Sequence, residues 1–106
     1  NAVLLTLQPH EDVRSAINEV CANLALKEAS IMGVGSLIGA VFAHGPAMTA
    51  AISEMLLLPG AKVSQGRCTA LPVACVDPEA VIYQGDLLLG HGPVLITCEL
   101  LLREEP

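Results

Sequence analysis

Residues 9–26, PHEDVRSAINEVCANLAL, carry the clearest periodic pattern of the chain. Their apolar side chains recur three and four positions apart, at Val13, Ala16, Ile17, Val20, Cys21 and Leu24. This spacing places them on one stripe of a helix. Pro9 precedes the stripe, and Glu11 and Asp12 stand where acidic groups favour the positive end of a helix dipole. The segment therefore predicts an amphipathic helix whose polar face lies in solvent.

Apolar runs of strand length flank this helix. Residues 2–7, AVLLTL, predict a short buried strand before it. Further strands are predicted after it over residues 29–34, 37–43, 81–89 and 92–102. In the last of these, VLITCELLL is apolar on both faces, so we expect the helix on one side and another subunit on the other. Neither a repeat nor a linker is visible, and the chain of 106 residues is predicted to be a single α+β domain, 1–106.

Glycine and proline mark the expected breaks between these strands. Glycines 33, 35 and 39 do not have the spacing of a dinucleotide-binding loop, because Ile38 stands where a glycine is needed. They favour a tight turn at Gly35-Ser36 or a bulge. Pro72, inside the alternating segment 66–75, predicts an edge position or a bulge.

The composition limits the possible functions. Hydrophobic residues make up 53% and charged residues 15%, which excludes disorder and indicates a buried subunit interface. The net charge is −6, with one Tyr, one Phe and no Trp, which argues against binding to nucleic acid. The four cysteines form no C-x-x-C pair and are interpreted as buried thiols in a reducing compartment, with two disulfides as the open alternative. We expect a cytoplasmic protein.

Four segments, in this order and spacing, resemble the PPC (plant and prokaryote conserved) domain: Leu5–Val13 (LTLQPHEDV), Met32–Ala40 (MGVGSLIGA), Val81–Leu89 and Gly92–Leu102. The resemblance implies an α+β fold with a mostly antiparallel sheet, one main helix and assembly into a homotrimer. Prokaryotic members are commonly labelled DNA-binding. Metal-binding members carry three histidines where this chain has Ala70, Pro72 and Asp86, so the comparison predicts no metal site and no cofactor.

The candidate residues for a ligand cleft are Asp86, Glu99, His44, His91, Gly35 and Ser36. Asp86 is interpreted either as a hydrogen-bonding turn residue or as a carboxylate in an intersubunit cleft. Glu99 is expected to form an interfacial hydrogen bond or an ion pair, with Arg67 or Arg103 as partner. Ser36 lacks the surroundings of a nucleophile elbow, so no catalytic residue is predicted.

These observations favour a non-catalytic oligomeric interaction module without a membrane partner. Two alternatives stay open, namely a DNA-associated regulator and a small-ligand binder or enzyme that uses intersubunit clefts.

Overall fold

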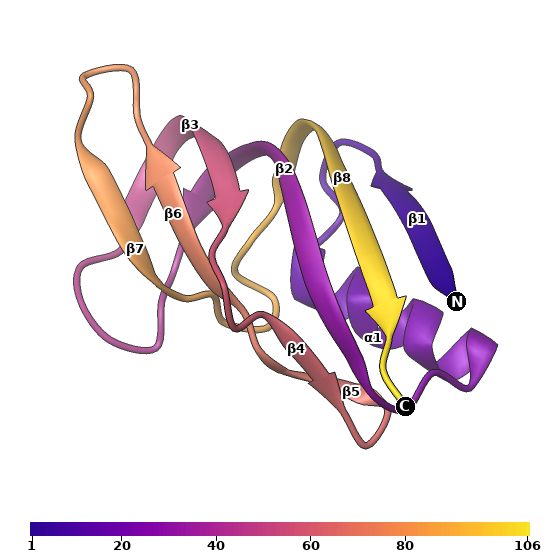
Figure 1. Cartoon of the computed structure of the whole chain (residues 1–106). Coiled ribbons are helices and arrows are strands. Elements are labelled where there is room, and N and C mark those ends of the chain that lie inside the picture. The colour runs from indigo at the N-terminus through magenta and orange to yellow at the C-terminus, as the bar shows by residue number, and fades with distance from the viewer.

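The computed structural model describes residues 1–49 and 51–106 and shows a curled sheet with a helix against it (Figure 1). The elements in chain order are β1 (Ala2–Leu7), α1 (Val13–Leu24), β2 (Ala29–Ala40), β3 (Met48–Leu57), β4 (Lys62–Ser64), β5 (Arg67–Ala70), β6 (Pro72–Val76), β7 (Ile82–Asp86) and β8 (Val94–Glu104). Within the described part of the chain, no helix has the length and apolarity needed to cross a membrane.

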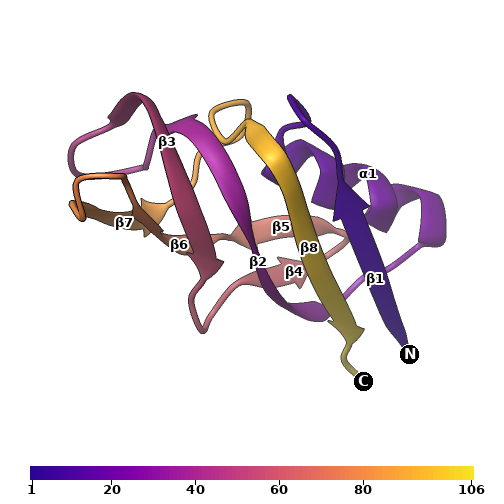
Figure 2. The ribbon, with the colours of Figure 1, turned by 90° about the horizontal axis from the view of Figure 1, so that it is seen from above.

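The strands pair in the order β1-β8-β2-β3-β6-β7. β4 pairs with the first residues of β2, on the edge opposite β8, and β5 pairs with β4. The pairs are antiparallel. The β4–β5 hairpin curls back toward α1, and Figure 2 shows both on the same side of the long strands. The predicted α+β fold with a mostly antiparallel sheet is therefore confirmed.

The helix and the first strand lie where the sequence predicts them. β1 spans residues 2–7, and α1 buries Val13, Ile17 and Cys21 in the core. The core continues into the inner side chains of β8, of which Leu100 and Leu102 are fully buried. The apolar stripe of the helix thus covers one face of the central strands.

Asp12 fixes the start of α1 to the loop between β7 and β8. Its carboxylate accepts hydrogen bonds from the backbone and hydroxyl of Ser15 at 3.0 and 2.7 Å, and from the backbone N–H of Gly90 and Gly92 at 3.0 and 2.9 Å. Burial raises the pKa of Asp12, but these hydrogen bonds outweigh burial and hold the pKa below its ordinary value. One N-cap residue therefore orders two segments.

The turn predicted at Gly35-Ser36 is wrong, because β2 runs without interruption from Ala29 to Ala40. A Cβ on Gly33 or Gly35 would lie 2.6 Å from the backbone of β8, so these glycines permit close approach of the neighbouring strand. The predicted bulge is present: the register with β8 shifts between Gly35 and Leu37, and that with β3 shifts around Gly39, which has φ 76°.

The edge position predicted for Pro72 is also wrong. Pro72 is the first residue of β6, and β6 lies between β3 and β7. The missing N–H is tolerated because Pro72 begins its strand, after β5 has ended at Ala70.

Candidate interaction face and clefts

The sheet has one face on the core and a second face on which no helix or strand of the described residues packs. β8 shows the difference directly: Cys98, Leu100 and Leu102 are fully buried, whereas the alternating residues Thr97, Glu99 and Leu101 are only half-buried. Figures 1 and 2 place α1 on one side of β1 and β8. We call the opposite surface the open face.

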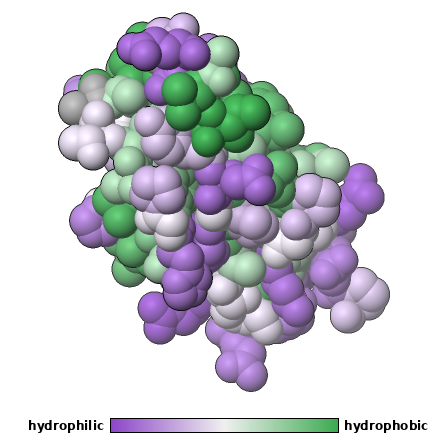
Figure 3. Space-filling view, turned by 90° about the vertical axis from the view of Figure 1, so that its left-hand side faces the viewer, coloured by the Kyte–Doolittle hydropathy of each residue, from purple (hydrophilic) through white to green (hydrophobic). Residues whose placement is uncertain are grey.

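Large apolar side chains line the open face. On β1 and β2, Leu4 is 73% exposed and Val34 is 53% exposed. The exposed apolar side chains of this face are Leu4, Met32, Val34, Ile38, Ile52, Leu56, Val76 and Ile82. Seen from the β6–β7 end, hydrophobic side chains gather just below a hydrophilic tip (Figure 3). The prediction that β8 is covered by the helix on one side is confirmed, and its other side is open in a single chain.

Glu99 lies within this apolar surface. Its register partners are Thr6 on β1 and Val34 on β2. The hydroxyl of Thr97 donates to Glu99 Oε1 at 3.5 Å. The described residues form no ion pair between Glu99 and either Arg67 or Arg103. Within one chain, neither arginine is therefore the partner of Glu99.

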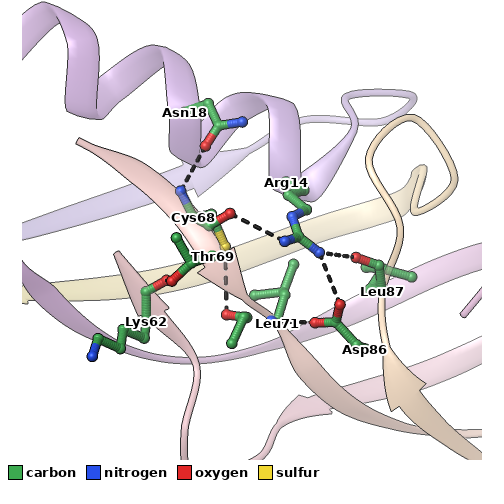
Figure 4. Close-up of polar contacts among 9 residues, drawn as sticks. Arg14, Asn18, Lys62, Cys68, Thr69, Leu71, Asp86 and Leu87 are labelled. Atoms are coloured by element: carbon green, nitrogen blue, oxygen red, sulfur yellow. Dashed lines mark hydrogen bonds and ion pairs between the residues drawn. The ribbon is translucent and has the colours of Figure 1, made fainter. Parts of the chain in front are cut away.

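Asp86 is held in a structural network that joins α1 to the sheet (Figure 4). Arg14 Nη1 donates to Asp86 Oδ2 at 3.2 Å and to the carbonyl oxygen of Leu87 at 2.8 Å, and Nη2 donates to that of Cys68 at 3.1 Å. The backbone N–H of Leu71 donates to Asp86 Oδ1 at 2.6 Å. Each carboxylate oxygen of Asp86 therefore accepts a hydrogen bond from within the chain, which favours the hydrogen-bonding interpretation of this residue over the cleft interpretation.

The sequence did not predict the role of Arg14. The sequence predicts that the polar face of the helix lies in solvent, whereas the Arg14 side chain on this helix is only 14% exposed. One turn further, Asn18 Oδ1 accepts a hydrogen bond from the backbone N–H of Cys68 at 2.8 Å. The sequence did hold a signal for this contact: Arg14 and Asn18 are polar residues four positions apart, so they lie on the same side of the helix, beside its apolar stripe.

The positions at which the resemblance places metal-binding histidines do come together. Pro72 is the register partner of Asp86, and Ala70 precedes Leu71, whose N–H donates to Asp86. In this chain the side chains there are a methyl group, a pyrrolidine ring and a carboxylate already paired with Arg14. This donor set does not fit a transition metal, which needs three or four convergent ligands. The described residues also contain no group of three His, Cys, Asp or Glu that could hold a metal ion.

Ser36 borders a groove of about 330 Å³ on the open face. Its hydroxyl accepts a hydrogen bond from the backbone N–H of Ile96 at 3.1 Å. Glu54 and Asp77 line the same groove, so its polar rim is acidic. Gly35 precedes Ser36 and pairs with Cys98 of β8, where the absence of a side chain permits the close approach of the two strands.

The two loop histidines lie on the surface. His91 lines a second groove, of about 290 Å³, together with Met48 and Pro93. His44 is exposed in the β2–β3 loop and is not one of that groove's lining residues. The two imidazoles therefore do not line this groove together.

The four cysteines are buried free thiols, as the sequence predicted. Burial raises the pKa of Cys68 to about 11 and that of Cys98 to about 12. Both side chains are therefore protonated at neutral pH and are poor nucleophiles.

No protein-family model and no curated protein matches this sequence. Solved structures do match. A PPC (plant- and prokaryote-conserved) protein from Pyrococcus horikoshii superposes with a TM-score of 0.75, covering 100% of this chain and 80% of that one, at 17% identity. The chain has the PPC fold.

Two further structures share the PPC fold. A "putative DNA-binding protein" from Bacteroides thetaiotaomicron has a TM-score of 0.81 at 13% identity, covering 98% of this chain and 78% of that one. A metal-containing protein from Archaeoglobus fulgidus has a TM-score of 0.69 at 14% identity, covering 98% and 79%. Each of these likenesses also covers nearly the whole chain.

Proposed function

We propose that this chain is a non-catalytic, self-associating binding module whose open face is covered by other copies in a homotrimer. The observation that carries the proposal is the row of exposed apolar side chains on a sheet face that nothing in the described chain covers. Soluble monomers keep contiguous apolar patches small, and permanent interfaces are more apolar than ordinary surface. The low charged content, 15%, supports the same reading.

The number of copies rests on the resemblance to PPC domains, for which the homotrimer is the usual assembly. The non-catalytic role rests on the chemistry of the candidate residues. Asp86 forms an ion pair with Arg14, and the thiols of Cys68 and Cys98 are protonated at neutral pH. His44 is exposed in a loop and does not line the groove that His91 borders.

A matched pair of substitutions tests whether the open face carries the assembly. Val34 is 53% exposed on this face, and Leu24 is 55% exposed at the end of α1, away from it. In sedimentation velocity, Val34→Glu is expected to give single chains of 11.0 kDa, whereas Leu24→Glu is expected to sediment like the wild type. An unchanged mass for Val34→Glu, or dissociation by both substitutions, would contradict the proposal.

A DNA-associated regulator is the second candidate, and the name of the Bacteroides neighbour favours it. The charge of this chain opposes it, because Lys and Arg number 5 against 11 Asp and Glu. Each phosphate contact needs a cationic or strong hydrogen-bond donor. Retention on DNA that falls steeply with salt would favour this candidate over the interaction module.

A small-ligand binder is the third candidate, and the groove beside Ser36 favours it. The groove opens on the open face and is rimmed by Glu54 and Asp77. A small molecule retained through purification and found in this groove would support ligand binding in addition to assembly.

A further inference from the structure

Glu99 is an acidic residue within the open face. It is half-buried already in the single chain, between Thr6 and Val34. The next residue of β8 on the same face, toward the C-terminus, is Leu101. Covering this face with another copy removes water from the Glu99 carboxylate, and a desolvated carboxylate is costly unless a cation or several donors meet it.

The described residues bring neither a cation nor several donors to Glu99. Thr97 supplies one hydrogen bond of 3.5 Å, and Val34 and Leu101 are apolar. The ion pair formed by the described residues is Arg14–Asp86, on the other side of the sheet. A cation that meets Glu99 in the assembly would therefore come from the molecule that covers the open face.

The cations of the open face lie at one end of it. Arg103 is exposed, four residues beyond Glu99 on β8, with Ser30 and Ala2 as register partners. Four residues of strand span about 13 Å, so the two side chains start far apart within one chain. Lys62 lies at the same end, opposite Ser30 on β4.

Arg103 also borders a groove that can receive a side chain. The groove, of about 310 Å³, is lined by Met32, Leu58 and Gly60 among others. The open face thus carries an acid in its middle, a cation at one end and a hollow beside that cation. Glu54 and Asp77 lie at the opposite end, on the rim of the Ser36 groove.

We propose that in the assembly Glu99 of one copy pairs with Arg103 of the neighbouring copy. The inference rests on the proposed self-association and adds which residues set its direction. The pair joins two different positions of the face, so in a ring each copy can offer Glu99 to one neighbour and Arg103 to the other. Leu101 and Met32 exclude water around the pair, and charge complementarity fixes the register of the two sheets.

The experiment uses reversed charges in the full chain. Glu99→Arg and Arg103→Glu each place like charges across the interface, and each is expected to raise the dissociation constant of the assembly about tenfold or more. The double variant Glu99→Arg/Arg103→Glu restores opposite charges at every interface and keeps the net charge at −6. It is expected to associate like the wild type. Glu19→Arg, on the exposed face of α1, makes the same charge change as Glu99→Arg and serves as the control.

The outcomes separate this inference from the proposed function. Single variants that associate like the wild type, or a double variant no tighter than the single ones, would overturn the pairing while leaving self-association intact. A wild-type protein that stays a single chain would overturn both. Circular dichroism of each variant shows whether it is folded, and the double variant keeps the test valid if one single variant unfolds.

Discussion

The contact between Arg14 and the sheet gives a sharp stability prediction. Arg14→Met keeps most of the apolar stem of the side chain but removes the guanidinium group. The carbonyl oxygens of Cys68 and Leu87 then lose their donor, and Asp86 loses its cation. Hydrogen bonds to charged groups contribute about 1.5–3 kcal/mol each, and removing one member of a buried ion pair costs about 3–5 kcal/mol.

The exposure of Asp86 lowers this figure. Its side chain is 38% exposed, so water replaces part of what Arg14 supplied. We therefore expect Arg14→Met to reduce the free energy of unfolding by about 3 kcal/mol, equivalent to a fall in Tm of roughly 10 °C or more.

The assay is urea unfolding followed by circular dichroism at one fixed protein concentration, because self-association makes stability depend on concentration. Arg67→Met is the matched control, since Arg67 is exposed and forms no side-chain hydrogen bond among those described. The control is expected to lie within about 0.5 kcal/mol of the wild type. Equal stability of Arg14→Met and Arg67→Met would refute the assignment of Arg14 as the group that fastens α1 to the sheet.

Three further predictions concern Asp12, the thiols and DNA. The pKa of Asp12 is lower in the folded chain than its ordinary value of 3.8, so its stabilising contribution is present above that value and is lost as the pH falls through the folded pKa. In urea unfolding, Asp12→Ala is therefore expected to reduce the free energy of unfolding by about 1–2 kcal/mol at pH 7 and by less near pH 3. An equal reduction at the two pH values would contradict this. A thiol reagent is expected to label Cys68 and Cys98 slowly in the native protein at pH 8, because burial raises the pKa of Cys68 to about 11 and that of Cys98 to about 12, and to label all four cysteines rapidly in urea. Rapid labelling of Cys68 and Cys98 in the native protein would disprove their burial. Fluorescence anisotropy at physiological salt is expected to show no binding to duplex DNA tighter than about 10⁻⁴ M, and a submicromolar affinity would favour the regulator.

Short-range patterns in the sequence predicted the local elements. The helix stripe from Val13 to Leu24 and the first strand, residues 2–7, depend on neighbours a few positions away, and both lie where they were expected. The glycines of β2 did not allow such a prediction. Gly33 and Gly35 are needed because β8, more than sixty residues later, passes close to them, and a turn gives the same local pattern.

The same distinction holds for the candidate site. Asp86 and Glu99 were selected because each is an acid inside an apolar strand, and the structure gives them different surroundings. Asp86 meets Arg14 from a helix 72 residues earlier in the chain, a contact that only the tertiary fold creates. Glu99 meets no cation among the described contacts, which is why the prediction of an interfacial partner stays a prediction.

The molar mass of the native protein tests the central claim most directly. Light scattering of the wild-type chain, diluted from about 100 to about 1 μM, is expected to give about 33 kDa throughout, three times the 11.0 kDa of one chain. A mass of 11.0 kDa across this range would contradict the account, because the open face would then be exposed to water in the functional protein.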